Sequence, residues 1–288
     1  MKRLARVPIK FKEALQRYDF RIKKSLGQNF LIDKNIQKII ISSAGLKRED
    51  FIFEIGAGFG ELSRALAKEA GRVIALEVDK DLVSILRETL ADCPNLKVIA
   101  GDILKINLEE VLDKDYEWKI VANLPYYLTT PIINRLLKSR LKLNCLILML
   151  QREVAERILA HPGTKAYGAL SIFVQYYTHP ELILPVKKTC FYPQPKVDSA
   201  LIKLKPRRTK VKIKDESLFF SLVKASFQMR RKTLLNALVR AENLSFSKEE
   251  IEKVLGLANI DPRQRGETLS LEEFWEISNL LKGTLREM

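Results

Sequence analysis

Between residues 51 and 151 the sequence alternates short apolar runs with amphipathic segments, and this alternation constrains the fold more than any other feature. The apolar runs are nearly continuous in Val, Ile, Leu and Ala, which is typical of parallel strands covered by helices on both faces. The segments 61–70 and 80–91 between them have helical periodicity. The sequence therefore predicts an α/β fold with a doubly wound sheet. The strands are expected at 51–56, 72–78, 96–101, 118–124 and 143–151.

The chain continues the sheet beyond residue 151 in a less regular way. A helix is expected at 167–177, followed by strand-like runs at 181–186 and 198–205. These two runs would extend the sheet as a hairpin-like edge. A further helix, expected near 130, follows the strand at 118–124.

The two ends of the chain differ from this central region. Residues 1–24 read as a basic arm with a short helix over 11–18, and Asp33 is a suitable N-cap for the next helix. After the linker-like run at 205–214 the pattern is entirely helical. We expect three parts: the arm at 1–24, an α/β domain at 25–206 and a small all-α C-terminal domain at 207–288. The helices of the last part are expected at 216–228, 230–241, 247–256 and 270–282.

The charge of the chain indicates a polyanionic partner. Lys and Arg number 50 against 35 Asp and Glu, a net charge of +15. Residues 1–30 hold nine Lys or Arg and two acidic residues, and six of the ten residues at 205–214 are Lys or Arg, with no acidic residue among them. A charged surface suited to high temperature is the alternative, but such a surface mixes the two signs. The clusters of one sign favour contact with nucleic-acid phosphates.

Several classes of protein are disfavoured by composition. No apolar run reaches the about 18 residues that a membrane helix needs, and the basic start of the chain lacks the apolar core of a secretory signal. Cys93, Cys145 and Cys190 are scattered, so neither a metal site nor a disulfide framework is expected. The two histidines, His161 and His179, lie in turn-like contexts and are expected to be solvated. A reduced, cytoplasmic setting fits best.

A glycine-rich turn and two strand-end acids indicate a nucleoside cofactor. Gly56, Gly58 and Gly60 follow a strand and precede a helix, where glycine lets the backbone turn sharply and approach a ligand. Glu77 ends the next strand, and a carboxylate there can accept both hydroxyl protons of a ribose. Asp102 ends the third strand and could accept a hydrogen bond from an adenine amine. Since the spacing is not that of a dinucleotide fingerprint, S-adenosylmethionine (SAM) fits best.

The stretch Asn123–Tyr126, with the sequence NLPY, is expected to lie in the same crevice at the end of the fourth strand. An aromatic amine is a poor nucleophile because its lone pair is delocalised into the ring. Acceptors such as the Asn123 side-chain carbonyl and the Leu124 backbone carbonyl would favour a pyramidal nitrogen. Pro125 would fix the turn, and Tyr126 would stack on the base, a contact worth about 1–3 kcal/mol. The alternative is an ordinary turn with a buried tyrosine.

Phe191 provides a second aromatic candidate, in the segment CFYPQP. It could close the other face of a bound base. Packing of Phe191 and Tyr192 within a loop is an equally good interpretation, and the sequence does not decide between them.

Nine blocks in this order resemble the ribosomal RNA adenine N6-dimethyltransferases of the kasugamycin-resistance type, from about residue 23 to the C-terminus. Two positions depart from that family: the chain has Ala57 where proline is common, and its start is longer than usual. The blocks are SLGQNFL, EIGAGFGELS, LEVDKDL, GDIL, NLPYYLTTPII, MLQREVAERI, FYPQPKVDSA, SFQMRRKTLLNAL and DPRQRGETLSLEEF.

The resemblance implies a Rossmann-like SAM-dependent methyltransferase sheet with a small helical domain. It also implies dimethylation of the N6 amines of two adjacent adenosines near the 3′ end of small-subunit rRNA, with a 30S precursor as partner. By motif match, catalytic positioning falls on Asn123, Leu124, Pro125 and Tyr126, with Phe191 as a second stacker. Cofactor contacts fall on Asn29, Leu31, Gly56, Gly58, Glu77, Asp102, Ile103 and Asn123. No metal is implied, and a monomer is expected.

Three alternatives remain open on the sequence. A macrolide-resistance enzyme, which methylates one adenosine of 23S rRNA, shares the cofactor motifs, but the RRKTLLNAL and DPRQRGETLSLEEF blocks favour the small-subunit type. A non-catalytic RNA-binding assembly factor would not need Glu77, Asp102 and Asn123. DNA adenine methyltransferases typically have an acidic residue where this chain has Asn123. The basic arm at 1–24 could contact rRNA or be a disordered tail.

Overall fold

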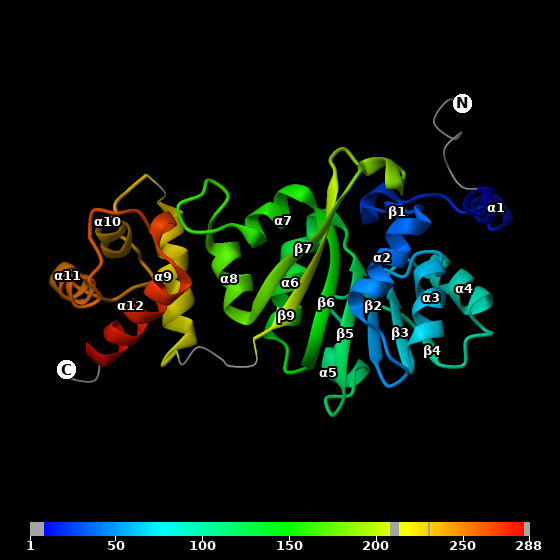
Figure 1. The fold of residues 1–288 in the computed structure, drawn as a ribbon, viewed down its shortest axis with the longest axis horizontal. Helices are drawn as coiled ribbons and strands as arrows, with labels where there is room; N and C mark the ends of the chain where they lie inside the picture. The colour runs from blue at the N-terminus through cyan, green and yellow to red at the C-terminus, as the bar shows by residue number, and fades with distance from the viewer. Residues whose placement is uncertain (1–8, 208–212, 230, 285–288) are drawn as a thin grey trace. The chain divides into compact units, whose positions relative to one another are not determined.

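The computed structural model describes residues 9–207, 213–229 and 231–284, and its α/β part is built on a seven-stranded sheet (Figure 1). The strand order is β4-β3-β2-β5-β6-β9-β7. The strands are β1 (Phe30–Leu31), β2 (Phe51–Ile55), β3 (Arg72–Glu77), β4 (Leu96–Ala100), β5 (Glu117–Asn123), β6 (Lys142–Gln151), β7 (Thr178–Val186), β8 (Phe191–Tyr192) and β9 (Ser199–Pro206).

Five neighbouring strands of the sheet are parallel, as the alternating pattern predicts. Strands β4, β3, β2, β5 and β6 pair in parallel, and β9 then pairs antiparallel with β6. Strand β7 lies beyond β9 at the edge, so the expected extension by a hairpin-like pair is confirmed. In this register Glu77 lies opposite Ala100, and Asn123 lies opposite Met149. The carboxyl ends of β2, β3 and β5 therefore meet at one edge of the sheet.

Both faces of the sheet are buried along its inner strands β3, β2, β5 and β6. One hydrophobic cluster joins β2, β5 and β6 to helices α2 and α3 through residues such as Ile52, Val121 and Ile147. Strand residues that point the opposite way, such as Phe53 and Ile120, are also fully buried. This two-sided burial explains why the strands read as continuous apolar runs rather than as alternating ones.

Most helices begin where the sequence places a capping side chain. Asp33 accepts hydrogen bonds from the backbone N–H groups of Asn35 and Ile36, which confirms it as the N-cap of α2. The helices are α1 (Ile9–Arg17), α2 (Lys34–Ala44), α3 (Glu61–Glu69), α4 (Lys80–Thr89), α5 (Leu108–Val111), α6 (Thr129–Lys138), α7 (Arg152–Leu159), α8 (Ala169–Tyr177), α9 (Glu216–Gln228), α10 (Leu234–Val239), α11 (Lys248–Leu257) and α12 (Leu271–Thr284). Single 3-10 turns lie at Lys24–Leu26, Tyr126–Leu128, Lys188–Cys190 and Gly266–Thr268.

Two features of the fold differ from the sequence-based expectation. The helix expected at 230–241 is the shorter α10, because the Thr233 side chain accepts from the backbone N–H of Asn236 and starts the helix there. A small antiparallel sheet of β1 and β8 was not expected. It pairs Phe30 with Tyr192 and Leu31 with Phe191, and two-residue strands carry no periodicity that could reveal them.

The described part of the N-terminal arm is ordered against the α/β fold. Helix α1 confirms the short helix expected at 11–18. Its Phe11 ring lies 5.6 Å from Phe30, 5.3 Å from Phe59 and 5.9 Å from Tyr192. Phe20 also packs on Phe59, at 5.2 Å. Residues 1–8, which include three of the arm's nine Lys or Arg, lie outside the described residues.

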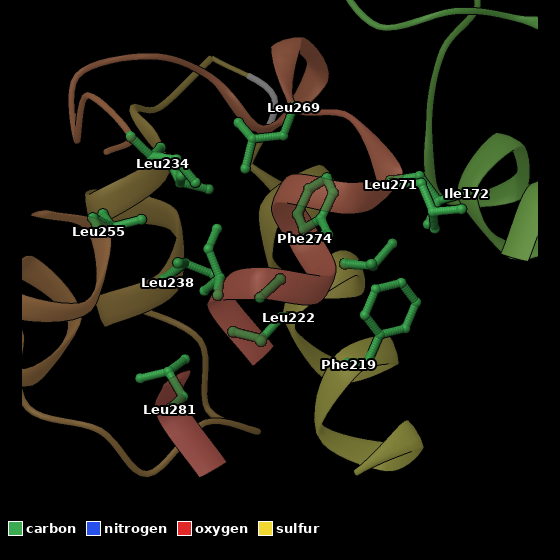
Figure 2. Close-up of a cluster of buried hydrophobic side chains, with 14 of the residues drawn as sticks. Ile172, Phe219, Leu222, Leu234, Leu238, Leu255, Leu269, Leu271, Phe274 and Leu281 are labelled. Atoms are coloured by element: carbon green, nitrogen blue, oxygen red, sulfur yellow. The ribbon is translucent and has the colours of Figure 1, made fainter. Parts of the chain in front are cut away.

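The C-terminal helices have their own hydrophobic core (Figure 2). Phe219 and Leu222 of α9 and Phe274 of α12 project into it, together with side chains from α10 and α11. Tyr167 also belongs to this core, and its hydroxyl donates a hydrogen bond to the Leu269 carbonyl at 2.9 Å.

The contacts divide the chain into two compact units at places that differ from the expected domain limits. The first unit extends to Ala155 and resumes over Glu181–Pro206, and the second comprises Glu156–Pro180 together with the chain from Arg207 onward. The expected limit at 206/207 coincides with one of these divisions. The segment Glu156–Pro180, which we had assigned to the α/β domain, groups with the helices instead because Ile172 and Tyr176 pack in their core.

Candidate active site

The turn between β2 and α3 requires its glycines. Gly56, Gly58 and Gly60 have φ angles of 79°, 59° and 81°, a region that strains other residues. A Cβ atom on Gly58 would lie 3.2 Å from the ring of Phe30. The N–H of Gly56 donates to the Leu76 carbonyl of β3 at 2.9 Å, which ties the turn to the neighbouring strand. The backbone of this turn is therefore exposed to close approach at the carboxyl edge of the sheet.

Glu77 is held rigidly beside this turn. Its carboxylate accepts the backbone N–H groups of Gly58 at 2.9 Å, Val78 at 2.9 Å and Asp79 at 3.0 Å. The side chain is buried. Burial raises the pKa of the Glu77 carboxyl, and the three hydrogen bonds oppose that rise because they stabilise the charged form. The result is a fixed acceptor at the end of β3.

The loop before β1 closes over the turn from the other side. The Asn123 Nδ2 atom donates to the Asn29 carbonyl at 2.9 Å. Gln28 Nε2 donates to Asp79 Oδ2 at 2.8 Å, and Lys23 Nζ donates to Asp79 Oδ1 at 2.5 Å. Asp79 in turn caps α4. The loop is therefore anchored to both β5 and the segment after β3.

The Asn123–Tyr126 stretch forms a tight turn at the end of β5. Leu124 N–H donates to the Met149 carbonyl at 3.0 Å, and the Pro125 carbonyl accepts from Leu128 N–H at 3.0 Å. The Tyr126 hydroxyl shares a hydrogen bond of 2.5 Å with Ser199 Oγ. Burial raises the pKa of the Tyr126 phenol, against the lowering effect of that hydrogen bond. Tyr126 is only half-buried, so part of its ring remains accessible.

The side chain of Asn123 has a hydrogen-bond acceptor, its Oδ1 atom, that is available to a ligand. Its Nδ2 atom is engaged by Asn29, which assigns the orientation of the amide. Within residues 9–207, 213–229 and 231–284, nothing donates a hydrogen bond to its Oδ1 atom. The side chain is partly exposed. A ligand amine could therefore be received there.

These residues line two adjoining cavities. Gly56, Gly58, Asn123 and Phe30 contribute to both, so the cavities meet at the glycine turn. Eight of the residues expected from the sequence line the first cavity: Asn29, Gly56, Gly58, Glu77, Asn123, Leu124, Pro125 and Tyr126. Leu31 lines the second cavity, together with Phe11, Gln37, Glu54, Phe59 and Glu61.

Asp102 and Ile103 lie outside the lining of both cavities. Asp102 follows β4, and its Oδ1 atom accepts from Leu104 N–H at 2.9 Å. Lys105 Nζ lies 3.9 Å from the other oxygen. Ile103 is buried. Gly101 N–H donates to the Glu77 carbonyl, so the two strand ends are adjacent. The structure thus places Asp102 beside the cavity without bringing it into the lining.

Phe191 does not lie where a second stacking residue is needed. Its side chain is 2% exposed and belongs to the core cluster that includes α2 and α3. Its backbone pairs with Leu31 in the β1–β8 sheet. The packing interpretation of this segment therefore replaces the stacking one.

Sequence reasoning missed several polar residues of the site. Asp79 lies within the LEVDKDL block but was not singled out, and Gln28 lies beside Asn29. Ser199, the partner of Tyr126, is distant in sequence, and only the β6–β9 pairing brings it near. Glu54, on β2, is a buried carboxyl that lines the second cavity. The presence of an acidic residue, Glu54, in the otherwise apolar strand FIFEI could have identified it from the sequence.

Neither a metal centre nor a membrane span is found in the described ranges. No group of three or more His, Cys, Asp or Glu side chains there is placed to hold a metal ion. Among the same residues, no helix has the length and apolarity needed to cross a membrane. The three cysteines are free thiols.

Comparisons with known proteins agree over nearly the whole chain. The family model described as "Ribosomal RNA adenine dimethylase" matches residues 19–277, so most of the N-terminal arm precedes the match. The "Ribosomal RNA small subunit methyltransferase A" of Geobacillus sp. (strain WCH70) is 49% identical over 284 residues, covering 96% of this chain and 98% of that protein.

Two solved structures have the same fold. The dimethyladenosine transferase of Plasmodium falciparum superposes with a TM-score of 0.76 at 26% identity, covering 89% of this chain and 98% of that one. The 23S rRNA methyltransferase ErmE superposes with a TM-score of 0.68 at 24% identity, covering 88% and 99%. At that identity the second likeness concerns the fold alone.

Proposed function

Because the chain belongs to the ribosomal RNA adenine dimethylase family, we propose that it uses SAM to dimethylate the N6 amines of two adjacent adenosines near the 3′ end of 16S rRNA. The observation that carries this proposal is the position of the Asn123–Tyr126 turn. It lies at the carboxyl end of β5 and lines the same cavity as Gly56, Gly58 and Glu77. A base held by that turn would lie beside a nucleoside cofactor held by the glycines and Glu77.

The cavities fit a positively charged nucleoside. Their acidic side chains are Glu54, Glu61 and Glu77, and no Lys, Arg or His from the described ranges lines either one. Gly56 and Gly58 leave space where a side chain would reach Asn123 or Phe30. When bound, SAM supplies an electrophilic methyl group on a sulfonium. Glu77 would receive the ribose hydroxyls, and Asn29 and Leu31 would border the cofactor from the preceding loop.

The Asn123–Tyr126 turn would orient the target amine. The free Oδ1 of Asn123 and the Leu124 carbonyl accept its two hydrogens, which turns the nitrogen lone pair away from the ring and toward the methyl donor. The hydrogen bond from Asn123 Nδ2 to the Asn29 carbonyl fixes the amide in the required orientation. Alignment of the reacting atoms then supplies most of the rate advantage. No strong base is required, since methyl transfer makes the amine acidic.

Tyr126 would hold the base by stacking. Its hydroxyl is engaged by Ser199, and this contact limits rotation of the ring. The proposal assigns no stacking role to Phe191, which is buried. A base bound here has to leave its neighbours in the RNA, which costs a few kcal/mol, and stacking on Tyr126 offsets part of that cost.

The basic arm and linker are proposed to contact rRNA phosphates.

The small-subunit target is supported by the 49% identity to a small-subunit enzyme over nearly the whole of both chains. The 23S rRNA alternative has in its favour the shared cofactor motifs and a likeness of fold. We further propose that the protein acts as a monomer on a 30S precursor in the cytoplasm. Light scattering of the purified chain would test whether it is a monomer.

A methylation assay tests the proposed function. Unmethylated 30S subunits and naked 23S rRNA are incubated separately with the protein and labelled SAM, and the nucleosides are then analysed by mass spectrometry. We expect N6,N6-dimethyladenosine from the 30S reaction only. Label found only in 23S rRNA would establish the macrolide-resistance type. SAM binding without any methylation of either RNA would favour a non-catalytic assembly factor.

A further inference from the structure

Tyr127 directly follows the proposed base-binding turn, and the mechanism above does not use it. It lies in the single 3-10 turn Tyr126–Leu128 and is 58% exposed, the largest fraction of any aromatic residue that the structure describes. Tyr116, which is also exposed, stacks on Phe51 with ring centroids 4.0 Å apart. Among the described residues, Tyr127 has no such ring partner. Its ring is therefore an accessible aromatic surface beside the candidate site.

The ring of Tyr127 lies against the loop that closes the first cavity. A Cβ atom on Gly27 would lie 2.9 Å from Tyr127 Cε1 and 3.1 Å from Cδ1, so the ring rests directly on the glycine backbone. The same Cβ position is 3.7 Å from Pro125 Cβ. Gly27 and Pro125 line the first cavity, whereas Tyr127 does not. Tyr127 is therefore placed outside the cavity, against two residues of its wall.

The two consecutive tyrosines of this turn point in different directions. The Tyr126 hydroxyl reaches Ser199 of β9, and Tyr126 lines the first cavity. The ring of Tyr127 instead reaches the loop before β1. Consecutive side chains of a 3-10 turn point about 120° apart, because the turn has three residues. A base that stacks on Tyr126 inside the cavity therefore leaves the ring of Tyr127 free for a second base.

The proposed substrate supplies a second base at this place. Its two target adenosines are adjacent in the RNA, so when one base leaves its neighbours to enter the cavity, the next base loses a stacking partner as well. Aromatic side chains hold successive unpaired bases by stacking on them. The carbonyl of Lys24 accepts the N–H of Gly27 at 3.0 Å, and the side chains of Arg21 and Lys24 are exposed. Cationic groups for the RNA backbone thus lie on the same loop and arm as the surface under Tyr127.

We propose that the exposed ring of Tyr127 stacks on the unpaired base next to the one held in the cavity, and so keeps the neighbouring adenosine at the site while the first is methylated. This proposal rests on the proposed function, because it requires an RNA with adjacent target adenosines. Tyr127 does not touch the reacting atoms, so its contact is equally strong before and during methyl transfer. It should therefore determine how tightly the RNA is held and leave the rate of the chemical step unchanged.

Steady-state kinetics on unmethylated 30S subunits test this role in the full-length chain. Tyr127→Ala should raise KM for the subunits by about 10-fold or more, as expected for one lost stacking contact, and change kcat by less than about twofold. Tyr127→Leu should show the same defect, because it restores apolar bulk without an aromatic face. Tyr127→Phe and Tyr127→Trp should behave nearly as the unmodified chain does. Affinity for SAM, measured by calorimetry, should be the same in all four variants.

Tyr116→Ala is the matched control for these variants. Tyr116 is also an exposed tyrosine, but it precedes β5, whereas Tyr127 follows that strand. The two residues therefore lie at opposite ends of β5. Tyr116→Ala should change neither KM for the subunits nor kcat.

Binding of short RNA hairpins separates the contact from catalysis. The intact hairpin has two adjacent adenosines in its loop, and each of two derivatives lacks one of these bases. Fluorescence anisotropy in the presence of S-adenosylhomocysteine gives their affinities for the unmodified chain and for Tyr127→Ala. At least one derivative should bind the unmodified chain about 10-fold more weakly than the intact hairpin does. Tyr127→Ala should bind that derivative and the intact hairpin equally, within about twofold, because the two changes remove the same contact.

The outcomes separate this inference from the proposed function. If the unmodified chain does not methylate 30S subunits, the proposed function is wrong and the inference falls with it. If it methylates them, a normal KM in Tyr127→Ala, rescue by Tyr127→Leu, or a loss confined to kcat would each overturn the stacking role. Equal binding of all three hairpins by the unmodified chain would also overturn it. So would a weakened derivative whose defect persists in Tyr127→Ala, because the missing base would then contact another residue.

Discussion

Asn123 combines two tasks in one side chain. Its Nδ2 atom holds the loop at Asn29, and its Oδ1 atom remains available to a ligand. A carboxylate at this position would keep an acceptor but lose the donor. The amide is therefore the group that both closes the cavity and presents an acceptor within it.

Replacing Asn123 with alanine should separate catalysis from cofactor binding. We expect turnover on 30S subunits to fall by about 100-fold or more, the range seen when one group that stabilises a transition state is removed. SAM affinity should fall much less, because Glu77 and the glycine turn remain. Single-turnover kinetics and calorimetry measure the two effects. Asn123→Asp, which keeps an acceptor, should retain more activity than the alanine variant, and near-normal turnover by Asn123→Ala would remove the amide from the mechanism.

The Glu54 carboxyl should leave a signature in the stability of the ligand-free protein. Its pKa is raised in the folded state, so the folded protein holds a proton that the unfolded chain releases above about pH 4.5. Stability should therefore fall as the pH rises from 4.5 to 8, by at most about 1.4 kcal/mol per pH unit from this group. Denaturant unfolding of the unmodified chain and of Glu54→Gln tests this point. As the pH rises, the free energy of unfolding of the unmodified chain should fall relative to that of Glu54→Gln. A difference that stays constant with pH would contradict this expectation.

At the residue scale, strand-end positions were predictable and buried partners were not. Gly56, Glu77 and Asn123 follow apolar runs, so the parallel sheet brings them to one edge. Phe191 could not be placed from sequence, because its burial depends on the two-residue pairing of β1 with β8. Ser199 meets Tyr126 only through the pairing of β9 with β6, which no local pattern shows.

Among the elements, helix α1 brings part of the basic arm to the second cavity. Phe11 packs on Phe30 and Phe59, and all three rings line the second cavity. The long strands and helices of the sheet were predictable from periodicity. Shorter elements were not: α7 was read only as part of a sequence block, and α10 begins late because of its threonine cap.

Removing the Phe11 ring should loosen α1 and speed up cofactor exchange. Replacing a buried phenylalanine with alanine costs about 3–5 kcal/mol where the surroundings cannot collapse. Here the replacement would weaken the packing of one short helix, α1, against the rest of the fold. Phe11→Ala should increase amide hydrogen exchange in α1 and raise the dissociation rate of SAM in stopped-flow experiments. Glu13→Ala, on the exposed side of the same helix, is the control. Unchanged dissociation in the Phe11 variant would show that α1 does not cover the cofactor.

On the scale of the whole molecule, charge and fold have separate origins. The net charge of +15 predicts association with a polyanion but says nothing about the sheet. The two hydrophobic cores explain why the division by contacts differs from the expected limits: Glu156–Pro180 follows the sheet in sequence, yet its apolar side chains complete the helical core. Helical periodicity alone does not reveal which core a helix joins.

Affinity for rRNA should fall steeply with salt concentration. Each phosphate contact made by a Lys or Arg contributes about one to the slope of log affinity against log salt. Arg21→Gln and Lys24→Gln, at exposed positions of the arm close to the cavity residue Leu26, should each reduce that slope by about one. Arg72→Gln, an exposed residue at the opposite end of β3 from Glu77, should leave it unchanged. A flat response in the unmodified protein would argue against a large phosphate footprint.

The backbone hydrogen bonds to Glu77 have a consequence for how binding is measured. Gly58, Val78 and Asp79 immobilise that carboxylate before any ligand arrives, so the entropy of ordering it is lost during folding and not during association. Substitutions that loosen these three amides should therefore reduce affinity without deleting any atom that touches the ligand. If the proposed site binds a nucleoside, the rigidity of the protein before binding should itself help to set how tightly that nucleoside is held.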